Sequence, residues 1–152
     1  MQQFKNEKRR EVDIVNMKTE EVREYYLQNL ELSKKEKQNR ENQLKERIKK
    51  AGKEAFEWIL AIKSKDGKVI GKIEVMEIGE GKAYFRINLP NKNWKRRYGV
   101  EAAKQFVKIC KENQYFSVIE LEKKNSTVQR FVADYAEKYK IKDFLLEIQN
   151  VV

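Results

Sequence analysis

The sequence predicts a single α/β domain, in the α+β form with a mixed sheet, whose element order is β-α-α-β-β-β-α-β-α-β. Apolar residues alternate with polar ones along most of residues 57–89, which is the period-two pattern of strands with one buried face. In other segments they recur at the spacing of helices that bury one side. A strand–helix–strand succession follows and favours a parallel, right-handed crossover, so the sheet is expected to be mixed.

The N-terminal segment is predicted as a basic arm followed by the first strand and the first helix. Residues 1–9 form the predicted frayed arm, and the domain is expected to span residues 10–152. Residues 11–17 alternate and predict a strand. Thr19 is a predicted N-cap, because two glutamates follow it and suit a first helical turn, and the helical face runs to about Leu32.

Residues 33–53 form the most polar segment, which is predicted as a second, mostly exposed helix. A few apolar side chains fall at helical spacing within it, and Gly52 suits a C-terminal stop. The lysines and arginines could be taken for a nucleic-acid-binding face. Glutamates interrupt that positive charge, so a solvated helix is the preferred interpretation.

Residues 57–89 predict three antiparallel strands joined by tight turns. The Asp-Gly dipeptide at 66–67 is a strong hairpin signal, and the glycines of residues 79–81 supply the second turn. Pro90 ends the third strand of this meander.

The next segment joins the meander to a helix through a stretch crowded with cations. We interpret this stretch as a loop, with the helix running from Gly99 to Glu112. A helix start offers unpaired amides and a positive dipole, so cations beside it form a candidate phosphate or pyrophosphate site. A solvated basic loop explains the same charges equally well. The stretch has no acidic residue among its cations, which are Lys92, Lys95, Arg96 and Arg97.

The C-terminal part is predicted to contain a strand, a helix and a final strand. Residues 115–121 form the predicted parallel strand. Residues 125–127 are capping residues for a helix whose apolar stripe includes Phe131 and Tyr135. Residues 141–148 alternate again and predict the last strand.

Composition limits the chemistry of the chain. The net charge of +10 favours an anionic partner, without choosing among a phosphorylated cofactor, nucleic acid and a membrane surface. The sequence has no histidine and a single cysteine, which argues against zinc chemistry, a Ser-His-Asp triad and an internal disulfide. Cys110 falls on an apolar stripe and is expected in the core. No apolar run long enough to span a bilayer and no signal peptide is recognisable, so a cytoplasmic protein is expected.

This order of elements resembles the GNAT superfamily of acyl-CoA-dependent N-acetyltransferases over about residues 10–149. The resemblance implies acetyl-CoA as cosubstrate and a primary amine as acceptor, either a small molecule or a protein amino terminus. It is carried by Ile70-Gly71-Lys72-Ile73 in the third strand, Ile87-Asn88-Leu89-Pro90 before the cofactor loop, Tyr98-Gly99-Val100-Glu101-Ala102 at the opening of the following helix, and Asn125 with Arg130 at the last helix.

The resemblance also implies where the cofactor binds. The backbone around Leu89 would polarise the thioester carbonyl, as an amide donor does in acyl transfer. One departure is that Arg97 stands where the family's pyrophosphate loop has its middle glycine, so Arg97 either contributes a side-chain contact in place of the close backbone approach or indicates weakened cofactor binding. The remaining implied cofactor-binding residues are Lys95, Arg96, Arg97, Tyr98, Gly99, Val100 and Asn125.

Two residues are candidates for catalysis by the same resemblance. The family often has a tyrosine acid about seven positions after the helix-opening asparagine, but that position is Val132 here, so Tyr135 serves only if the register slips. Glu120 matches a glutamate of members that acetylate protein amino termini, and it would relay a proton from the acceptor. The alternatives are a core aromatic for Tyr135 and a strand-edge carboxylate for Glu120.

The leading hypothesis is therefore an acetyl-CoA-dependent N-acetyltransferase with no metal. The alternatives are a protein of the same fold that binds coenzyme A or another anion without efficient catalysis, and a basic nucleic-acid-binding module, which lacks a recognition motif. Candidate acceptor-binding residues are Tyr25, Tyr26 and Tyr84, with core packing as the alternative for the first two. The sequence does not fix the oligomeric state, and a homodimer stays open.

Overall fold

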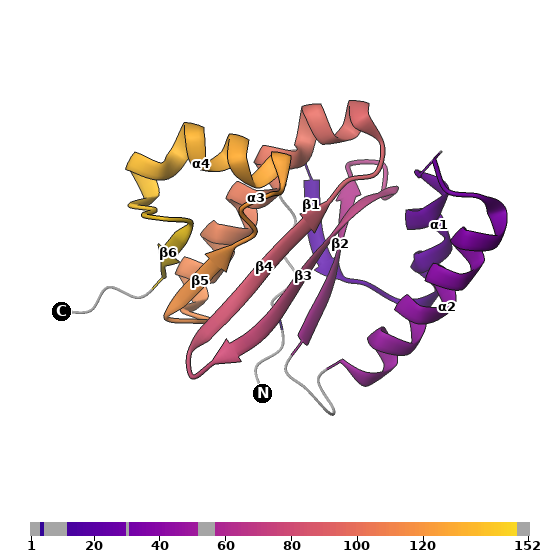
Figure 1. Ribbon diagram of the computed structural model, residues 1–152, viewed down its shortest axis with the longest axis horizontal. Coiled ribbons are helices and arrows are strands. Elements are labelled where there is room, and N and C mark those ends of the chain that lie inside the picture. The colour runs from indigo at the N-terminus through magenta and orange to yellow at the C-terminus, as the bar shows by residue number, and fades with distance from the viewer. Residues whose placement is uncertain (1–3, 5–11, 30, 52–56, 149–152) are drawn as a thin grey trace.

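The computed structural model describes residues 4, 12–29, 31–51 and 57–148. Within that part of the chain, six strands form one mixed sheet in the order β1-β2-β3-β4-β5-β6 (Figure 1). The strands are β1 (Val12–Asn16), β2 (Glu57–Ser64), β3 (Val69–Gly79), β4 (Lys82–Asn88), β5 (Val118–Leu121) and β6 (Leu145–Glu147). The helices are the 3-10 turn η1 (Thr19–Glu21), α1 (Val22–Leu27), α2 (Lys34–Lys50), α3 (Lys92–Asn113) and α4 (Ser126–Tyr139). The predicted fold class and element order are confirmed.

The predicted three-strand meander and parallel crossover are both present. Strands β2, β3 and β4 pair antiparallel, with Leu60 opposite Ile73 and Val75 opposite Phe85. Gly67 adopts a φ of 81°, as the turn after an Asp requires. Strand β5 then pairs parallel to β4, with α3 as the crossover between them.

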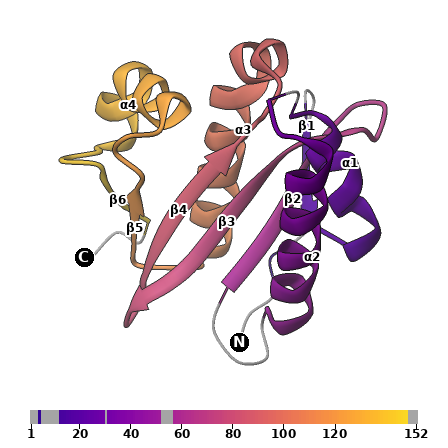
Figure 2. The same ribbon diagram turned by 45° about the vertical axis from the view of Figure 1, so that its right-hand side comes forward.

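The helices cover the two faces of the sheet in pairs. Helices α3 and α4 bury their apolar sides with β-strand residues in the larger core, whereas α1 and α2 build a smaller core on the opposite face. Figures 1 and 2 show α1 and α2 together on one side of the sheet and α3 and α4 on the other. Cys110 is buried in the larger core, as predicted, and burial raises the pKa of its thiol.

The prediction that the helix after β4 begins at Gly99 is wrong. Helix α3 begins at Lys92, directly after Asn91, whose Oδ1 accepts hydrogen bonds from the amides of Asn93 (2.9 Å) and Trp94 (3.3 Å). The cationic stretch is therefore the first two turns of a helix and not a loop. Asn91 is a strong N-cap residue, and Trp94 stacks on Tyr98 one turn later, at 5.6 Å between ring centroids.

Other boundaries also differ from the sequence prediction. The first helix is shorter, because a 3-10 turn precedes α1 and α1 ends at Leu27. Helix α2 is mostly exposed, as expected, but Glu41 is buried between Arg23 (3.3 Å) and Lys45 (3.0 Å). The predicted stop at Gly52 lies outside the described residues.

The last strand covers only Leu145–Glu147, and not all of residues 141–148. Asp143 and Phe144 adopt positive φ values of 50° and 59°, which extended backbone does not allow. They form a tight turn that Lys142 and Leu145 close with hydrogen bonds in both directions. The alternating pattern alone therefore overestimated the length of this strand.

The predicted basic arm lies outside the described residues except for Phe4. The Phe4 ring is buried in the larger core, 5.4 Å from the ring of Trp58 and 5.9 Å from the ring of Phe106 between centroids. At this residue the structure differs from a frayed arm, because the ring contributes to the core. Among the described residues, no helix combines the length and hydrophobicity that crossing a bilayer would require.

Helices α3 and α4 are in close contact where Gly99 meets Thr127. A Cβ atom at Gly99 would lie 2.9 Å from Thr127 Cγ2 and 3.1 Å from Thr127 Oγ1. Both residues are buried, so the neighbouring atoms have little room to move. The glycine therefore allows this packing distance.

We expect Gly99→Ala to lower the free energy of unfolding by about 1–3 kcal/mol, because the methyl group overpacks the helix contact. At an exposed position in a helix, the same change would instead raise the free energy of unfolding, by as much as about 1 kcal/mol. The matched test is Gly99→Ala in a Thr127→Ala background, where the clashing atoms are gone and the loss should disappear. Urea denaturation of the four proteins measures this coupling, and strictly additive effects would contradict the steric explanation.

Candidate active site

The candidate site lies where β4 and β5 separate. The two strands pair only over Lys82–Phe85 and Val118–Leu121, after which β4 continues to Asn88 without β5 (Figure 2). Asn125 spans this opening. Its Nδ2 donates to the carbonyl oxygen of Ile87 (2.6 Å), while its Oδ1 accepts from the amide of Val128 (3.1 Å) as the N-cap of α4. One side chain thus ties the start of α4 to the free end of β4.

A polar cavity of about 250 Å³ opens on the α1–α2 side of Asn125. Its walls come from α1, α2, the first half of β3, the end of β4, and the residues that follow β5. Side chains two residues apart on a strand share a face, which explains why alternate residues of β3 and β4 meet here. The lining residues are Tyr25, Tyr26, Asn29, Arg40, Lys72, Glu74, Arg86, Ile87, Asn88, Glu122 and Asn125.

Glu74 is the buried carboxylate of this cavity. It is 7% exposed, and it forms ion pairs with Lys72 of the same strand and with Arg47 of α2. Burial alone would raise the pKa of Glu74, but the two cations outweigh burial and lower that pKa. Glu74 therefore stays ionised, and Arg47, which also pairs with Glu57 at 2.9 Å, joins α2 to the sheet.

Two tyrosines of α1 face the same cavity. The Tyr25 hydroxyl accepts a hydrogen bond from Nδ2 of Asn88 (2.5 Å), and the rings of Tyr25 and Tyr26 meet edge to face at 4.9 Å. Burial raises the pKa of both phenols, and the nearby Glu74 adds to the increase. Both hydroxyls consequently remain protonated and can donate hydrogen bonds. Tyr25 is buried and packs in the smaller core, and it also lines this cavity.

A second, cationic cleft of about 240 Å³ lies between the first turns of α3 and α4. Side-chain charge and helix termini coincide in it. The amides of Val128 and Gln129 bond to Asn125, whereas Ser126 and Thr127 occupy the first helical positions, whose amides point out of a helix. This arrangement suits an anion. The lining residues are Lys92, Lys95, Arg96, Ser126, Thr127 and Arg130.

The structure separates the residues that the sequence grouped as a cofactor loop. Lys95 and Arg96 line the cationic cleft, but the Arg97 guanidinium lies over the ring of Tyr98, at 4.9 Å from its centroid. Gly99 is buried against Thr127, and the backbone amides from Lys95 onward lie within the α-helix. Side chains and the start of α4 therefore take the place of loop amides.

The other predicted residues divide in the same way. Leu89 follows β4 directly and its side chain is buried in the larger core. Glu120 and Tyr84 are register partners on β5 and β4, one step from the opening, and neither lines the polar cavity. Tyr135 packs between Phe131 and Tyr139, with Lys104 of α3 over its ring at 5.3 Å, and lines neither cavity.

Sequence reasoning missed Arg40, Lys72, Glu74 and Glu122. A signal was present for two of them, because Lys72 and Glu74 interrupt an otherwise apolar strand at the spacing of one face. Strand register would have placed them beside Arg86 and Asn88. Arg40 had no such signal, since it lies among many charged residues of α2.

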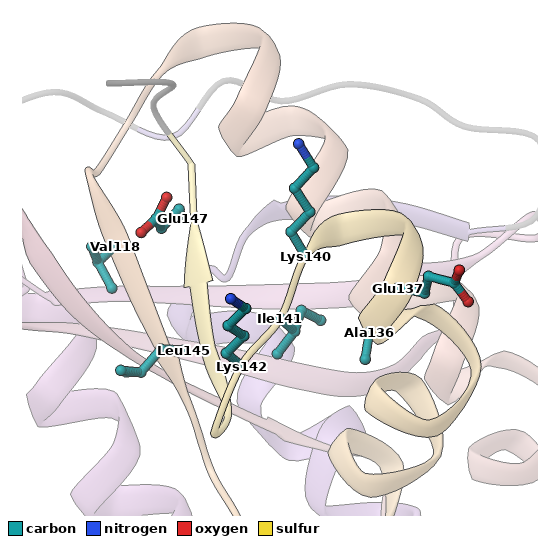
Figure 3. A pocket seen from close by; sticks show the side chains of 8 residues that line it. All are labelled: Val118, Ala136, Glu137, Lys140, Ile141, Lys142, Leu145 and Glu147. Carbon is teal, nitrogen blue, oxygen red and sulfur yellow. The ribbon is translucent and has the colours of Figure 1, made fainter. Parts of the chain in front are cut away.

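A larger cavity of about 720 Å³ lies at the β5–β6 edge of the sheet and shares no residue with these two. Figure 3 shows its walls, which come from β5, the end of α4 and β6. Apolar side chains such as Val118, Ile141 and Leu145 contribute to the walls, and Glu137 extends away from β6. The polar cavity and the cationic cleft are smaller, but a larger share of their lining side chains is polar or charged.

Comparison with known proteins confirms the fold. No protein-family model matches the sequence, and no curated protein matches it. Solved structures do match. A chimera of spermidine N-acetyltransferase SpeG from Vibrio cholerae and hSSAT aligns with a TM-score of 0.63 at 17% identity, over 82% of this chain and 79% of that one.

Two further structures agree. Ribosomal-protein-S5-alanine acetyltransferase from Vibrio fischeri aligns at a TM-score of 0.59 and 13% identity, over 85% of this chain and 80% of that one. A dodecameric spermidine N-acetyltransferase from V. cholerae aligns at a TM-score of 0.59 and 12% identity, over 82% of this chain and 77% of that one. The chain thus shares the GNAT fold of solved acetyltransferases, as the sequence predicted.

The lowered pKa of Glu74 makes the free energy of unfolding of the protein depend on pH. A carboxylate whose pKa is depressed in the folded protein stabilises it above the unfolded pKa, and this contribution disappears as pH falls through the folded pKa. We expect Glu74→Gln to lower the unfolding free energy at pH 7, and the difference from the wild type to shrink below about pH 4.3. Urea denaturation from pH 7 to pH 3 measures both, with the exposed Glu77→Gln as control. A difference that does not change with pH would contradict this account.

Proposed function

We propose that the protein is an N-acetyltransferase that transfers the acetyl group of acetyl-CoA to a primary amine. The observation that carries this proposal is the pair of cavities on either side of Asn125. Asn125 lines the polar cavity, while the next two residues, Ser126 and Thr127, line the cationic cleft. An anionic cosubstrate and a polar acceptor can therefore meet at the opening between β4 and β5. The shared fold with solved acetyltransferases supports the same reaction class.

The cationic cleft suits the phosphate groups of coenzyme A. Lys92, Lys95, Arg96 and Arg130 would hold these phosphates through their side chains, together with the outward amides at the start of α4. The cleft relies on flexible cations, because α3 is already helical where the family has its pyrophosphate loop.

We expect acetyl-CoA at 100 times its dissociation constant to stabilise the wild type by about 2.7 kcal/mol. Arg96→Glu combined with Arg130→Glu should weaken acetyl-CoA binding at least tenfold, about 1.4 kcal/mol, because both side chains line the cleft. The matched control is Arg97→Glu, a neighbouring charge reversal whose guanidinium lies over Tyr98 and outside the cleft lining. Calorimetric titration measures all three affinities. An equal loss for Arg97→Glu would restore the site that the sequence predicted.

The acceptor amine must lose a proton before it reacts. Acetyl-CoA supplies an activated acetyl thioester, which an amine attacks only as the free base. Glu74 is a poor proton acceptor, because Lys72 and Arg47 hold its charge and lower its pKa. Glu122 is the other carboxylate of the polar cavity. It has one cationic partner where Glu74 has two, and its side chain is more exposed, so we assign the proton to Glu122. Asn125 Nδ2 (3.1 Å) and Arg86 Nε (3.0 Å) hold the Glu122 carboxylate at the opening between the strands.

Glu120 is the second candidate, because it lies on the same face of the polypeptide two residues earlier. Tyr135 is the candidate for a different role, the proton donor to the leaving thiolate. It ranks below the two glutamates as a site residue because its ring packs between α3 and α4. Leu89 remains the proposed source of the amide that polarises the thioester carbonyl, and it follows β4 at the opening. Tyr25 and Tyr26 contact the acceptor through protonated hydroxyls.

We expect Glu122→Gln to lower the acetylation rate by about 10²-fold to 10⁴-fold, which is the usual contribution of a general base. Glutamine keeps the shape and can still accept from Asn125, so acetyl-CoA affinity should not change. Glu120→Gln should have a smaller effect, and Tyr135→Phe the smallest. Steady-state kinetics with acetyl-CoA and a panel of amines measure the three. A silent Glu122→Gln beside an inactive Tyr135→Phe would transfer the proton chemistry to α4. Binding of acetyl-CoA without transfer to any amine would favour the binding-protein alternative.

A further inference from the structure

We propose that the acceptor carries a carboxylate or phosphate group close to its amine, and that Arg40 of α2 binds this anionic group in the polar cavity. The inference rests on the proposed acetyl transfer and names the class of acceptor. Its basis is the charge that the cavity leaves uncompensated.

Both carboxylates of the cavity already have cationic partners. Glu74 pairs with Lys72 and Arg47, and Glu122 pairs with Arg86. Their negative charge is thus largely neutralised before any ligand enters. A polycationic acceptor would have to break these pairs in order to find an acidic partner.

Arg40 is the cation of the cavity that has no such partner. Among the residues that the structure describes, its guanidinium forms no ion pair, although it lines the cavity with Tyr25 and Tyr26. Its positive charge acts on both phenols and opposes the increase in their pKa values. A guanidinium beside phenolic donors is the arrangement that binds carboxylate or phosphate oxygens.

The sheet order sets the direction in which the acceptor lies. Arg40 and the tyrosines come from α1 and α2, which pack on the β1–β3 side, whereas Glu122 follows β5. The two ends of the cavity are therefore chemically different. The anionic group lies toward Arg40, and the amine lies toward Glu122 and the opening between β4 and β5. A volume of about 250 Å³ suits a small head group of this kind.

This charge pattern disfavours a polyamine. Cations outnumber carboxylates among the lining residues, and the whole chain carries a net charge of +10. Spermidine, which is named in two of the fold neighbours described above, would meet repulsion here. The protein therefore shares its fold with the spermidine acetyltransferases, but its cavity suits a different class of acceptor.

The test compares acceptors that differ in charge but little in shape. Glycine and glycinamide form one pair, phosphoethanolamine and ethanolamine form another, and spermidine is the polycation. In each pair only the acidic member carries an anionic group close to its amine, and its partner, called neutral here, carries none. We expect the wild type, with coenzyme A present, to bind the acidic member of at least one pair tenfold more tightly than its neutral partner. Arg40→Gln should abolish that preference, and Arg40→Glu should reverse it. Lys49→Gln is the matched control, since it removes a charge from the same helix outside the cavity lining. The two pairs separate a carboxylate site from a phosphate site.

Calorimetric binding keeps this inference separate from the proposed reaction. If acidic acceptors bind through Arg40 but no transfer occurs, the proposed function fails and the anion site stands. If transfer occurs to neutral amines or spermidine at least as well as to acidic ones, the enzyme assignment stands and the Arg40 inference is overturned. Equal binding of acidic and neutral members in the wild type also overturns it, whatever the activity.

Discussion

Two of the three hydrogen bonds of the Asn125 side chain, those with Ile87 and Val128, are the interaction on which the site depends. The amide nitrogen holds the end of β4 by donating to the Ile87 carbonyl, and the amide oxygen caps the start of α4 by accepting from the Val128 amide. Strands β4 and β5 have already separated at this level, so the sheet itself no longer fixes their distance. A backbone carbonyl at the end of a strand would otherwise lack its partner, at a cost of about 1–3 kcal/mol if buried. Asn125 therefore sets the separation of the two cavities and the width of the opening between them.

Charge compensation explains why a polar cavity can exist between a sheet and two helices. Glu74 faces away from the larger core, on a strand whose opposite face carries Ile73 and Val75. Burial would raise the pKa of an unpaired carboxylate in that position, whereas Lys72 and Arg47 lower the pKa and keep Glu74 charged. Arg47 also reaches Glu57 on β2, so one guanidinium connects α2 to two strands. The same ion pairs that stabilise the cavity wall compensate its negative charge, whereas Arg40 lines the cavity without an ion pair to any described residue.

Much of the fold could be predicted from the sequence because its signals are local. Asp-Gly at residues 66–67, the period-two runs around it and the capping residues at 125–127 each act within a few positions, and all three predictions are confirmed. The start of α3 was missed, although Asn91 is also a local cap, because the apolar helical spacing is recognisable only from Gly99 onward. The polar cavity was missed for a different reason. Arg40, Glu74 and Glu122 are far apart in the sequence, and only helix docking and strand register bring them together.

The structure of α3 changes the physical character of the cationic cleft. A phosphate loop binds anions with backbone amides, which are fixed before the ligand arrives. Here Lys92, Lys95, Arg96 and Arg130 must order long side chains upon binding, and each such ordering costs about 0.5–1.5 kcal/mol. Charges on exposed side chains are also screened by salt over about 8 Å at physiological ionic strength. Affinity for a phosphorylated ligand should accordingly depend on salt more steeply than in a protein with a glycine-rich loop. Helix α3 begins early, directly after its cap Asn91, and position 97 carries an arginine where the family has a glycine. In both respects, side-chain charge stands where a phosphate loop would present backbone amides.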